Sequence, residues 1–377
     1  MVNEFRPDYL SPPGDTLSEV LESLGMTQAE LAQRMGRPRK TINEIIQGKT
    51  AITSETALQL ELVLNIPASF WNNREQQYQE ANARIEEEKQ LADQVDWLEE
   101  NQLPIHEMRQ RGWIAHVDDR VSQLRDVLRF FGVASTQQCE AVWASYDPVF
   151  RQSTKRPANW TAVYAWLRKG ELEAQEIVCQ PYDERAFYDV LAEVRGLTTE
   201  KFETVWPGVV EQCARVGVAV VVVPALPNTA VSGATRWLTP DKALLQLSLR
   251  YKSDDQFWFS FFHEGGHVYK HGKKKLFIEL EALNGEKDKL EQEADKFAAD
   301  LLIPPASLRR FKREIGSRYP SRDEVKRFAQ ELGITPGIVV GRLQHEDVMP
   351  HANLNDLRCG LQLGDDGQIV CGPFRKA

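Results

Sequence analysis

The chain has 377 residues, of which 42% are apolar and 27% are charged, and its formal net charge is −9. This length predicts two or three domains with real hydrophobic cores, in a protein of ordinary soluble composition. A negative net charge gives no overall attraction to nucleic acid, so any DNA binding must come from a local patch. The longest apolar run, Val216–Leu226, contains Gly217 and Pro224 and is too short to span a bilayer, so we expect no membrane partner.

The first residues lack the pattern of a secretory signal peptide, and the Pro-rich residues 1–15 are expected to form a flexible arm. The five cysteines are widely scattered, and none belongs to a C-x-x-C motif: Cys139, Cys179, Cys213, Cys359 and Cys371. An odd and sparse set of this kind predicts reduced thiols in a cytoplasmic protein.

Residues 16–69 carry the start and stop signals of several short helices in quick succession. Thr27 and Glu30 form the capping box of one helix, Pro38 opens the next at its first turn, and Thr53 starts another. Short helices joined by short turns, with the third presenting polar residues outward, indicate a helix-turn-helix DNA-binding domain.

A local basic patch surrounds the entry to the third helix, and it consists of Arg34, Arg37, Arg39 and Lys40. Phosphates and base edges would meet the protein there, and Arg37 belongs to this contact surface. We expect major-groove contacts from Arg39, Lys40 and Asn43, and backbone contacts from Gln28, Thr41 and Lys49. The alternative is a small helical dimerisation module with a basic turn.

Residues from about 14 to 80 resemble the DNA-binding domain of Xre/HigA-type antitoxins. The resemblance rests on G-M-T-Q-A-E-L-A-Q-R-M-G (25–36), K-T-I-N-E-I-I-Q-G-K (40–49), I-T-S-E-T-A-L (52–58) and P-A-S-F-W-N-N (67–73). It implies a homodimer that binds palindromic double-stranded operator DNA and often represses its own promoter. Glu44 does not fit a phosphate-binding surface, because a carboxylate on the reading helix repels phosphate.

The middle of the chain shows helical patterns without recognisable chemistry. Residues 70–103 form an acidic connecting helix that ends before Pro104, and a weak heptad leaves a coiled-coil contact as the alternative to a solvated helix. Residues 104–204 form a helical middle region. Strands are then predicted at 218–223, 231–237 and 243–249, and Leu244–Leu249 is expected to be the edge strand that holds an extended substrate.

The H-E-x-x-H pattern stands at His263–His267, inside the aromatic stretch Phe257–His271. On a helix, positions i and i+4 lie one turn apart, so both imidazoles face one side and can bind one cation. Glu264 projects about 100° away, where it can accept a proton from water at that cation. The aromatic stretch predicts a buried helix, where unpaired His and Glu would be costly, and the Gly265-Gly266 pair predicts a close approach of another segment.

Two imidazoles leave a catalytic zinc site incomplete, because such a site uses three protein ligands and keeps one position open. His271 lies ~12 Å along the axis from His263, too far for one ion on a straight helix. A second helix offers Glu291, with Asp295 one turn further to accept the ring N–H of a ligand histidine, and Glu293 is the alternative ligand. The ligand types predict Zn2+, with Mn2+ as the alternative metal.

Residues 205–355 are similar to the ImmA/IrrE metallopeptidase family. The shared motifs are H-E-G-G-H (263–267), E-Q-E-A-D-K-F-A-A-D-L-L-I-P (291–304) and L-G-I-T-P-G-I-V-V-G-R-L-Q-H (332–345). The resemblance implies a gluzincin-like endopeptidase that cleaves a partner repressor or antitoxin. It implies metal ligands at His263, His267 and Glu291, and a general base at Glu264. Gly265 and Asp295 depart from the residues frequent at those positions.

Helices are expected at 306–315, 321–332 and 335–344, the last two resembling a helix-turn-helix with a packing role, and residues 356–377 form a tail with a short hairpin. The expected fold class is mainly α with a small β-sheet (α+β). It comprises a five-helix helix-turn-helix domain, a helical middle and a C-terminal zincin-like peptidase domain.

The sequence thus predicts an operator-binding regulator with a zinc endopeptidase domain, whose substrate is a repressor, antitoxin or toxin of the same locus. Four side chains are candidates for the oxyanion donor, and we expect His345 to be catalytic: His345, Arg342, Tyr269 and Arg236. One alternative is a non-enzymatic HigA-like repressor or antitoxin whose metal domain is structural or sensory. A third hypothesis is that the protein is an interaction scaffold.

Overall fold

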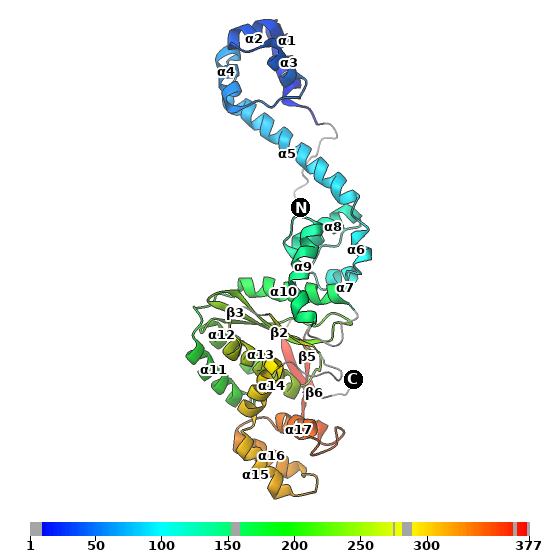
Figure 1. The fold of residues 1–377 in the computed structure, drawn as a ribbon, viewed down its shortest axis with the longest axis vertical. Helices are drawn as coiled ribbons and strands as arrows, with labels where there is room; N and C mark the ends of the chain where they lie inside the picture. Colours follow the sequence, from blue (N-terminus) through cyan, green and yellow to red (C-terminus); the bar gives the residue numbers. More distant parts are fainter. Residues whose placement is uncertain (1–9, 152–158, 274–275, 281–288, 365–367, 375–377) are drawn as a thin grey trace. The chain divides into compact units, whose positions relative to one another are not determined.

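The computed structural model describes residues 10–151, 159–273, 276–280, 289–364 and 368–374 (Figure 1). The chain divides into two compact units, one built from the part up to Asp96 with Asp118–Arg125 and the other from Trp97–Val117 with the part from Asp126 onward. The expected class, mainly helical with a small mixed sheet, is confirmed. The finer domain boundaries proposed from the sequence stay predictions.

The first unit begins with a cluster of short helices, which are α1 (Pro13–Leu24), α2 (Gln28–Met35), α3 (Arg39–Ile46) and α4 (Ser54–Leu64), followed by the longer α5 (Ala68–Ala92). Their apolar faces meet in one core, whose fully buried members include Leu17, Leu31, Ile42, Leu60 and Trp71. Because Trp71 belongs to α5, the start of that helix is part of this domain. The Glu75 carboxylate fixes it further by accepting the backbone N–H of Ile52 at 3.0 Å.

Most of the helix signals of this unit are confirmed, and two need correction. The Thr27 hydroxyl caps α2 by accepting the N–H of Glu30, but the Glu30 carboxylate pairs with Arg34 at 2.6 Å instead of returning to Thr27. The capping box is therefore only half formed. The expected arm is also too long, because α1 already begins at Pro13, whose fixed φ suits a first helical turn. Residues 1–9 of that arm lie outside the described residues.

The helices around the expected middle region are α6 (Trp97–Glu100), α7 (Ile105–Gln110), α8 (Arg120–Phe131), α9 (Thr136–Arg151), α10 (Trp160–Glu176), α11 (Glu184–Leu197) and α12 (Phe202–Ala214). All belong to the second unit except the start of α8, up to Arg125, which belongs to the first. The connecting helix predicted for residues 70–103 is not continuous. It is interrupted by a turn between Ala92 and Trp97, where Trp97 enters the core and stacks on Trp143 at 5.3 Å.

A four-stranded sheet in the order β1-β3-β2-β4 positions the candidate site, with β1 (Val218–Val222), β2 (Val231–Thr239), β3 (Lys242–Leu247) and β4 (Phe277–Leu280). β1 and β3 are parallel and the other pairs antiparallel. The three predicted strands are confirmed, but the prediction of an edge strand at Leu244–Leu249 is wrong. β3 is central, because β1 and β2 pair with its two sides, and β4 was not predicted at all.

Both faces of the sheet are covered by helices, α10 on one and α12 and α13 (Asp254–Lys270) on the other (Figure 1). The alternation of β3 shows this directly. Leu245 faces the large core that contains α13, whereas Gln246 faces α10 and donates to the carbonyl oxygen of Trp166 at 2.7 Å. A strand that is covered on both sides is expected to be a nearly continuous apolar run, and β3 has this pattern in the sequence.

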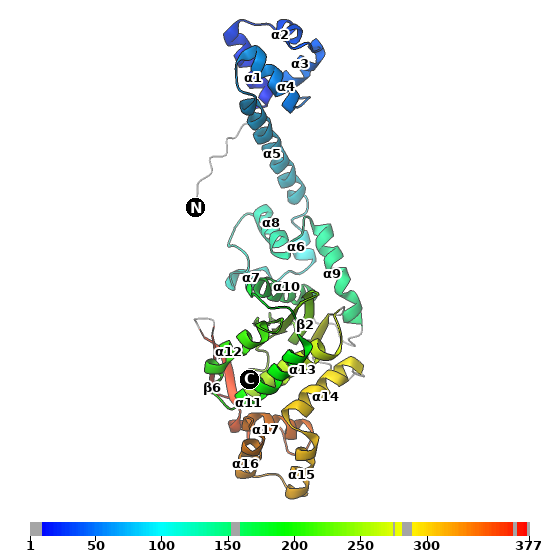
Figure 2. The same ribbon diagram turned by 90° about the vertical axis from the view of Figure 1, so that its left-hand side faces the viewer.

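The C-terminal helices are α14 (Lys289–Leu302), α15 (Pro305–Ile315), α16 (Arg322–Leu332) and α17 (Pro336–His345), and their positions agree with the predicted ranges (Figure 2). The α16–α17 pair has a packing role, as expected. Val339, Val340 and Leu343 of α17 are fully buried in the large core. A short 3-10 helix, η1 (Asn355–Leu357), leads to the tail.

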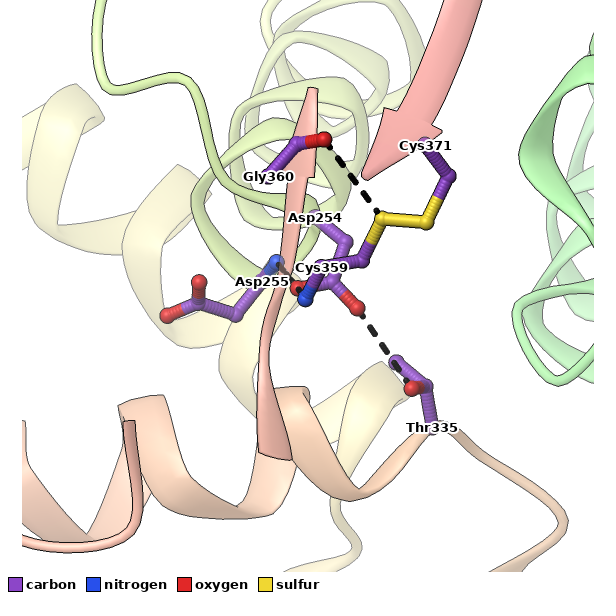
Figure 3. Close-up of a disulfide and its surroundings, with 6 residues drawn as sticks. All are labelled: Asp254, Asp255, Thr335, Cys359, Gly360 and Cys371. Carbon is purple, nitrogen blue, oxygen red and sulfur yellow. Dashed lines mark hydrogen bonds between the residues drawn. A yellow bond between two sulfur atoms is a disulfide. The ribbon is translucent and has the colours of Figure 1, made fainter. Parts of the chain in front are cut away.

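The tail forms the expected hairpin from β5 (Cys359–Leu363) and β6 (Ile369–Pro373) and attaches to the start of α13. The prediction that all cysteines are reduced is wrong for one pair, because Cys359 and Cys371 form a disulfide (Figure 3). The strand register sets Cys371 opposite Leu361, which brings it within reach of Cys359 two residues away. Cys139, Cys179 and Cys213 are free thiols.

The contact between this hairpin and the start of α13 includes a buried acidic pair (Figure 3). The Asp254 carboxylate accepts the N–H of Cys359 at 2.9 Å, and Arg358 lies 3.2 Å from the Asp255 carboxylate. Burial, together with the charge of Asp255, raises the pKa of Asp254 to about 7. Between about pH 4 and pH 7 the native state therefore holds a proton on Asp254 that the unfolded chain has released.

Asp254→Asn is expected to flatten the pH dependence of stability. A raised pKa contributes stability that is present below the unfolded pKa, near 4, and is lost as the pH rises through about 7. The asparagine still accepts the Cys359 N–H but cannot ionise. Thermal unfolding across this window should show a smaller decline of the midpoint in the variant than in the wild type. Equal declines would assign the pH dependence to other groups.

Candidate metal centre and DNA-binding surface

Helices α13 and α14 lie side by side, and their close packing positions the candidate metal centre (Figures 1 and 2). α13 is buried on nearly all sides, as its aromatic stretch predicted, with Phe257, Phe261 and Phe262 in the core. A Cβ at Gly266 would lie 3.0 Å from the Phe297 ring and 3.4 Å from the Cα of Ala294. Glycine at this position therefore lets α14 approach, which confirms the close approach predicted from the sequence.

His263, His267 and Glu291 converge at this contact. The Nε2 atoms of the two histidines are 3.1 Å apart, Glu291 Oε2 lies 3.1 Å from His263 Nε2, and Glu291 Oε1 lies 3.4 Å from His267 Nε2. Ligand atoms ~2.0–2.1 Å from a tetrahedral zinc ion are separated by about 3.3 Å from one another. The spacing and the donor types, two imidazoles and one carboxylate, therefore fit a zinc ion.

The charge states of these side chains suit metal binding at neutral pH. Burial lowers the pKa of His267 to about 4, so its ring is neutral and offers a lone pair. Burial acts to raise the pKa of Glu291, but hydrogen bonds from His263 and His267 outweigh it and hold that pKa below its ordinary value. The cluster thus presents the neutral imidazole of His267 beside an ionised carboxylate.

Two further acidic groups on α14 contact histidine rings of α13, Asp295 at His263 and Glu293 at His271. Asp295 Oδ1 lies 3.0 Å from His263 Nδ1, which is the position predicted for it. Glu293, the alternative ligand, is directed elsewhere and lies 3.3 Å from His271 Nε2. His271 itself contacts the Nδ1 atom of His267. The sequence analysis considered His271 only as a metal ligand and missed this contact, although the i, i+4 spacing from His267 signalled it.

Glu264 is completely buried and is held by two residues of β2 that the sequence analysis also missed. The Thr235 hydroxyl donates to Glu264 Oε2 at 2.5 Å. A Cβ at Gly233 would lie 2.5 Å from Glu264 Oε1, so only glycine leaves room for the carboxylate. Gly233 and Thr235 are two residues apart and face the same side of the strand, toward α13.

The four oxyanion candidates lie in different places in the structure. Arg236 points to the opposite face of β2 from Thr235, where it pairs with Glu171 at 2.5 Å, and Arg342 pairs with Glu346 at 2.6 Å. Tyr269 packs on the ring of Phe297. His345 is exposed on α17, whose close approach to α13 is at Asp254 and Asp255, about two turns before His263. The structure does not bring His345 into the cluster, and its catalytic role stays a prediction.

The predicted DNA-contact residues lie on and around α2 and α3 with different degrees of exposure. Arg39, Lys40 and Lys49 are exposed, whereas Gln28, Arg37, Thr41 and Asn43 are half-buried. Arg37 is engaged within the domain, since it donates to Gln59 Oε1 and pairs with Glu55 at 3.1 Å. Glu44, the acidic residue of the reading helix, lies 3.7 Å from Lys40 and offsets its charge.

Comparison with known proteins yields matches in both parts of the chain. Residues 17–71 match the helix-turn-helix family model, and residues 214–344 match the model of the IrrE N-terminal-like domain, a peptidase M78 family. The chain is 31% identical over 71 residues to the uncharacterized HTH-type transcriptional regulator YddM of Escherichia coli, across 19% of this chain and 76% of that protein.

Two solved structures are similar to the N-terminal part at 28% identity and a TM-score of 0.21. One is an addiction module antidote protein of the HigA family from Coxiella burnetii, with 22% of this chain and 92% of that chain covered. The other is the Pseudomonas aeruginosa antitoxin HigA with the higBA promoter, with 22% and 90% covered.

The matched ranges define a DNA-binding regulator domain joined to a peptidase-family domain. The chain belongs to the helix-turn-helix transcriptional regulators, and its residues 214–344 match the model of the M78 peptidase domain. Both resemblances stated from the sequence are thereby confirmed. Within the part of the chain that the structure describes, no helix is long and apolar enough to cross a membrane.

Proposed function

We propose that this protein binds operator DNA as a homodimer and that its peptidase domain is a zinc-dependent endopeptidase that cleaves a partner regulatory protein. The partner is a repressor, antitoxin or toxin of the same locus. The observation that carries the proposal is the convergence of His263, His267 and Glu291 beside the buried Glu264. Dimerisation of the N-terminal domain would cover Leu58 and Leu62, which are 57% and 85% exposed one turn apart on α4.

In this proposal the protein residues divide the hydrolysis among them. His263, His267 and Glu291 would hold a zinc ion, whose Lewis acidity would polarise a carbonyl and lower the pKa of water. Glu264 accepts a proton from the attacking water and delivers it to the leaving amine nitrogen as the C–N bond breaks. Thr235 holds Glu264 Oε2 in place for both transfers. Manganese is the alternative metal, and Asp295 orients His263.

Substrate binding is proposed at β4, the sheet edge nearest to the metal ligands. The Phe277 ring of this strand stacks on His267 with centroids 4.1 Å apart. Within the described residues β4 pairs with β2 alone, so its other side can accept an extended peptide through main-chain hydrogen bonds.

The direct test is to incubate the zinc-loaded full chain with purified proteins encoded beside its gene and to analyse the products by mass spectrometry. We expect one partner to be cut at a defined bond, and a chelator to stop the reaction. Absence of cleavage, with metal and DNA binding intact, would contradict the proposal.

A second candidate function is a regulator whose metal domain is structural or sensory. The observation that favours it is the closure of the site, since His263 and His267 are only 1% exposed and Glu264 is fully buried. Among the three candidate ligands, the Glu291 side chain is the most exposed, at 27%. Under this function, metal removal changes operator affinity, and no partner is cleaved.

DNA binding is tested by Arg39→Ala combined with Lys40→Ala, which is expected to abolish the gel shift of DNA from the protein's own promoter region. Each lost contact is worth about 1–3 kcal/mol if it reads a base, so affinity falls by orders of magnitude. Arg84→Ala with Lys89→Ala on α5 is the matched control, because it removes the same charge away from α3. Equal losses in the two double variants would show that only bulk charge matters.

A further inference from the structure

A second histidine–acid contact stands behind the candidate metal centre, at the C-terminal end of α13. His271 Nδ1 lies 2.9 Å from His267 Nδ1, and His271 Nε2 lies 3.3 Å from Glu293 Oε2. The His271 side chain is only 2% exposed, while Glu293 is 44% exposed. The Phe277 ring packs against both imidazoles, with centroids 4.1 Å from His267 and 5.4 Å from His271.

The directions of these contacts fix the tautomers. His267 turns Nε2 toward His263 and Glu291, so a metal ion would take that nitrogen and leave the proton on Nδ1. The Nδ1–H then donates to His271 Nδ1. His271 must in turn carry its own proton on Nε2, which donates to Glu293. Each nitrogen in this row therefore has one role, and none is left without a partner.

We propose that His271, held by Glu293, is the positioning residue for His267, fixing the tautomer and ring orientation that direct Nε2 into the metal site. The proposal rests on the metal centre of the proposed function and assigns a role to a residue outside the ligand set. His271 is not itself a ligand, because it contacts the side of the His267 ring that faces away from the cluster.

The charge balance of the site explains why a histidine, and not a second carboxylate, supports His267. Glu291 and Asp295 already place two carboxylates against His263 and His267, and Glu264 adds a third one buried beside them. These three carboxylates already outnumber the charges of a divalent cation, so a further acidic group at the position of His271 would add an uncompensated charge, which is costly away from water. An imidazole at position 271 accepts the hydrogen bond from His267 without adding a negative charge. The carboxylate that supports it, Glu293, then lies further out, where it is exposed.

The test compares metal affinity in His271→Leu and His271→Asn by competition with a chelating dye, using zinc alone. Leucine keeps the apolar packing on Phe277 but cannot accept a hydrogen bond, and we expect zinc affinity to fall about 10–100-fold. Asparagine places Oδ1 where Nδ1 stood and can accept the His267 proton, so affinity should recover most of that loss. Glu293→Gln is expected to cause a smaller loss than His271→Leu.

Three results separate the possible failures. Unfolding of the metal-free proteins should give similar midpoints for the leucine and asparagine variants, so that the difference in affinity reflects the lost hydrogen bond. If both variants bind zinc as the wild type does, or lose it equally, the role of His271 is refuted. If the wild type itself binds no zinc, the proposed metal centre fails instead.

Discussion

Replacing Glu264 with glutamine is expected to lower kcat for cleavage of the partner protein by about 10²–10⁴-fold while the metal stays bound. Glutamine has nearly the same volume, and its amide oxygen can still accept the hydrogen bond that the Thr235 hydroxyl gives to Oε2. It cannot accept a proton from water. The measurement combines single-turnover cleavage with metal analysis of the same preparation.

Glu331→Gln is a matched control, because it removes one exposed carboxylate of the same domain on α16, away from the metal ligands. It should cleave at the wild-type rate. Full-rate cleavage by Glu264→Gln would refute Glu264 as the base. If the variant loses both the metal and the cleavage activity, Glu264 is instead needed to build the site, through its contacts with Gly233 and Thr235.

Replacing Glu291 with alanine is expected to weaken zinc binding and to abolish cleavage. The loss of affinity should exceed about 10–100-fold, which is typical when a residue that only hydrogen-bonds to a metal ligand is removed. The variant deletes the carboxylate that lies 3.1 Å from His263 Nε2 and 3.4 Å from His267 Nε2, leaving two imidazoles to hold the ion. Affinity is measured by competition with a chelating dye.

Glu293→Ala is the comparison that decides between the two acids of this segment. Glu293 contacts His271 and not the ligand nitrogens, so its removal should leave most of the affinity. Should Glu293→Ala lose the metal while Glu291→Ala keeps it, the ligand assignment would be reversed.

Local patterns were sufficient to predict the elements that build the site. The i, i+4 spacing of His263 and His267 predicted one helix face, and the same spacing of Glu291 and Asp295 predicted a second. The structure brings the first three of these side chains together. Glycine at 266 signalled the close approach of the two helices, because a mid-helix glycine is unfavourable unless space is needed.

What the sequence did not predict depends on contacts between distant segments. Gly233 and Thr235 hold Glu264 only because β2 packs against α13. Nothing in the sequence of the strand indicates that α13 lies against it. The order of the strands is equally non-local, so β3 was wrongly expected at the edge. β4 has four residues, too few for a periodic pattern, and it pairs with β2 across more than thirty residues of sequence.

The most direct test of the central claim is anomalous diffraction at the zinc edge from crystals of the zinc-loaded full chain. We expect a single strong peak about 2 Å from His263 Nε2, His267 Nε2 and a carboxylate oxygen of Glu291. A zinc peak elsewhere, with none between these three side chains, would contradict the metal centre and with it the proposed peptidase.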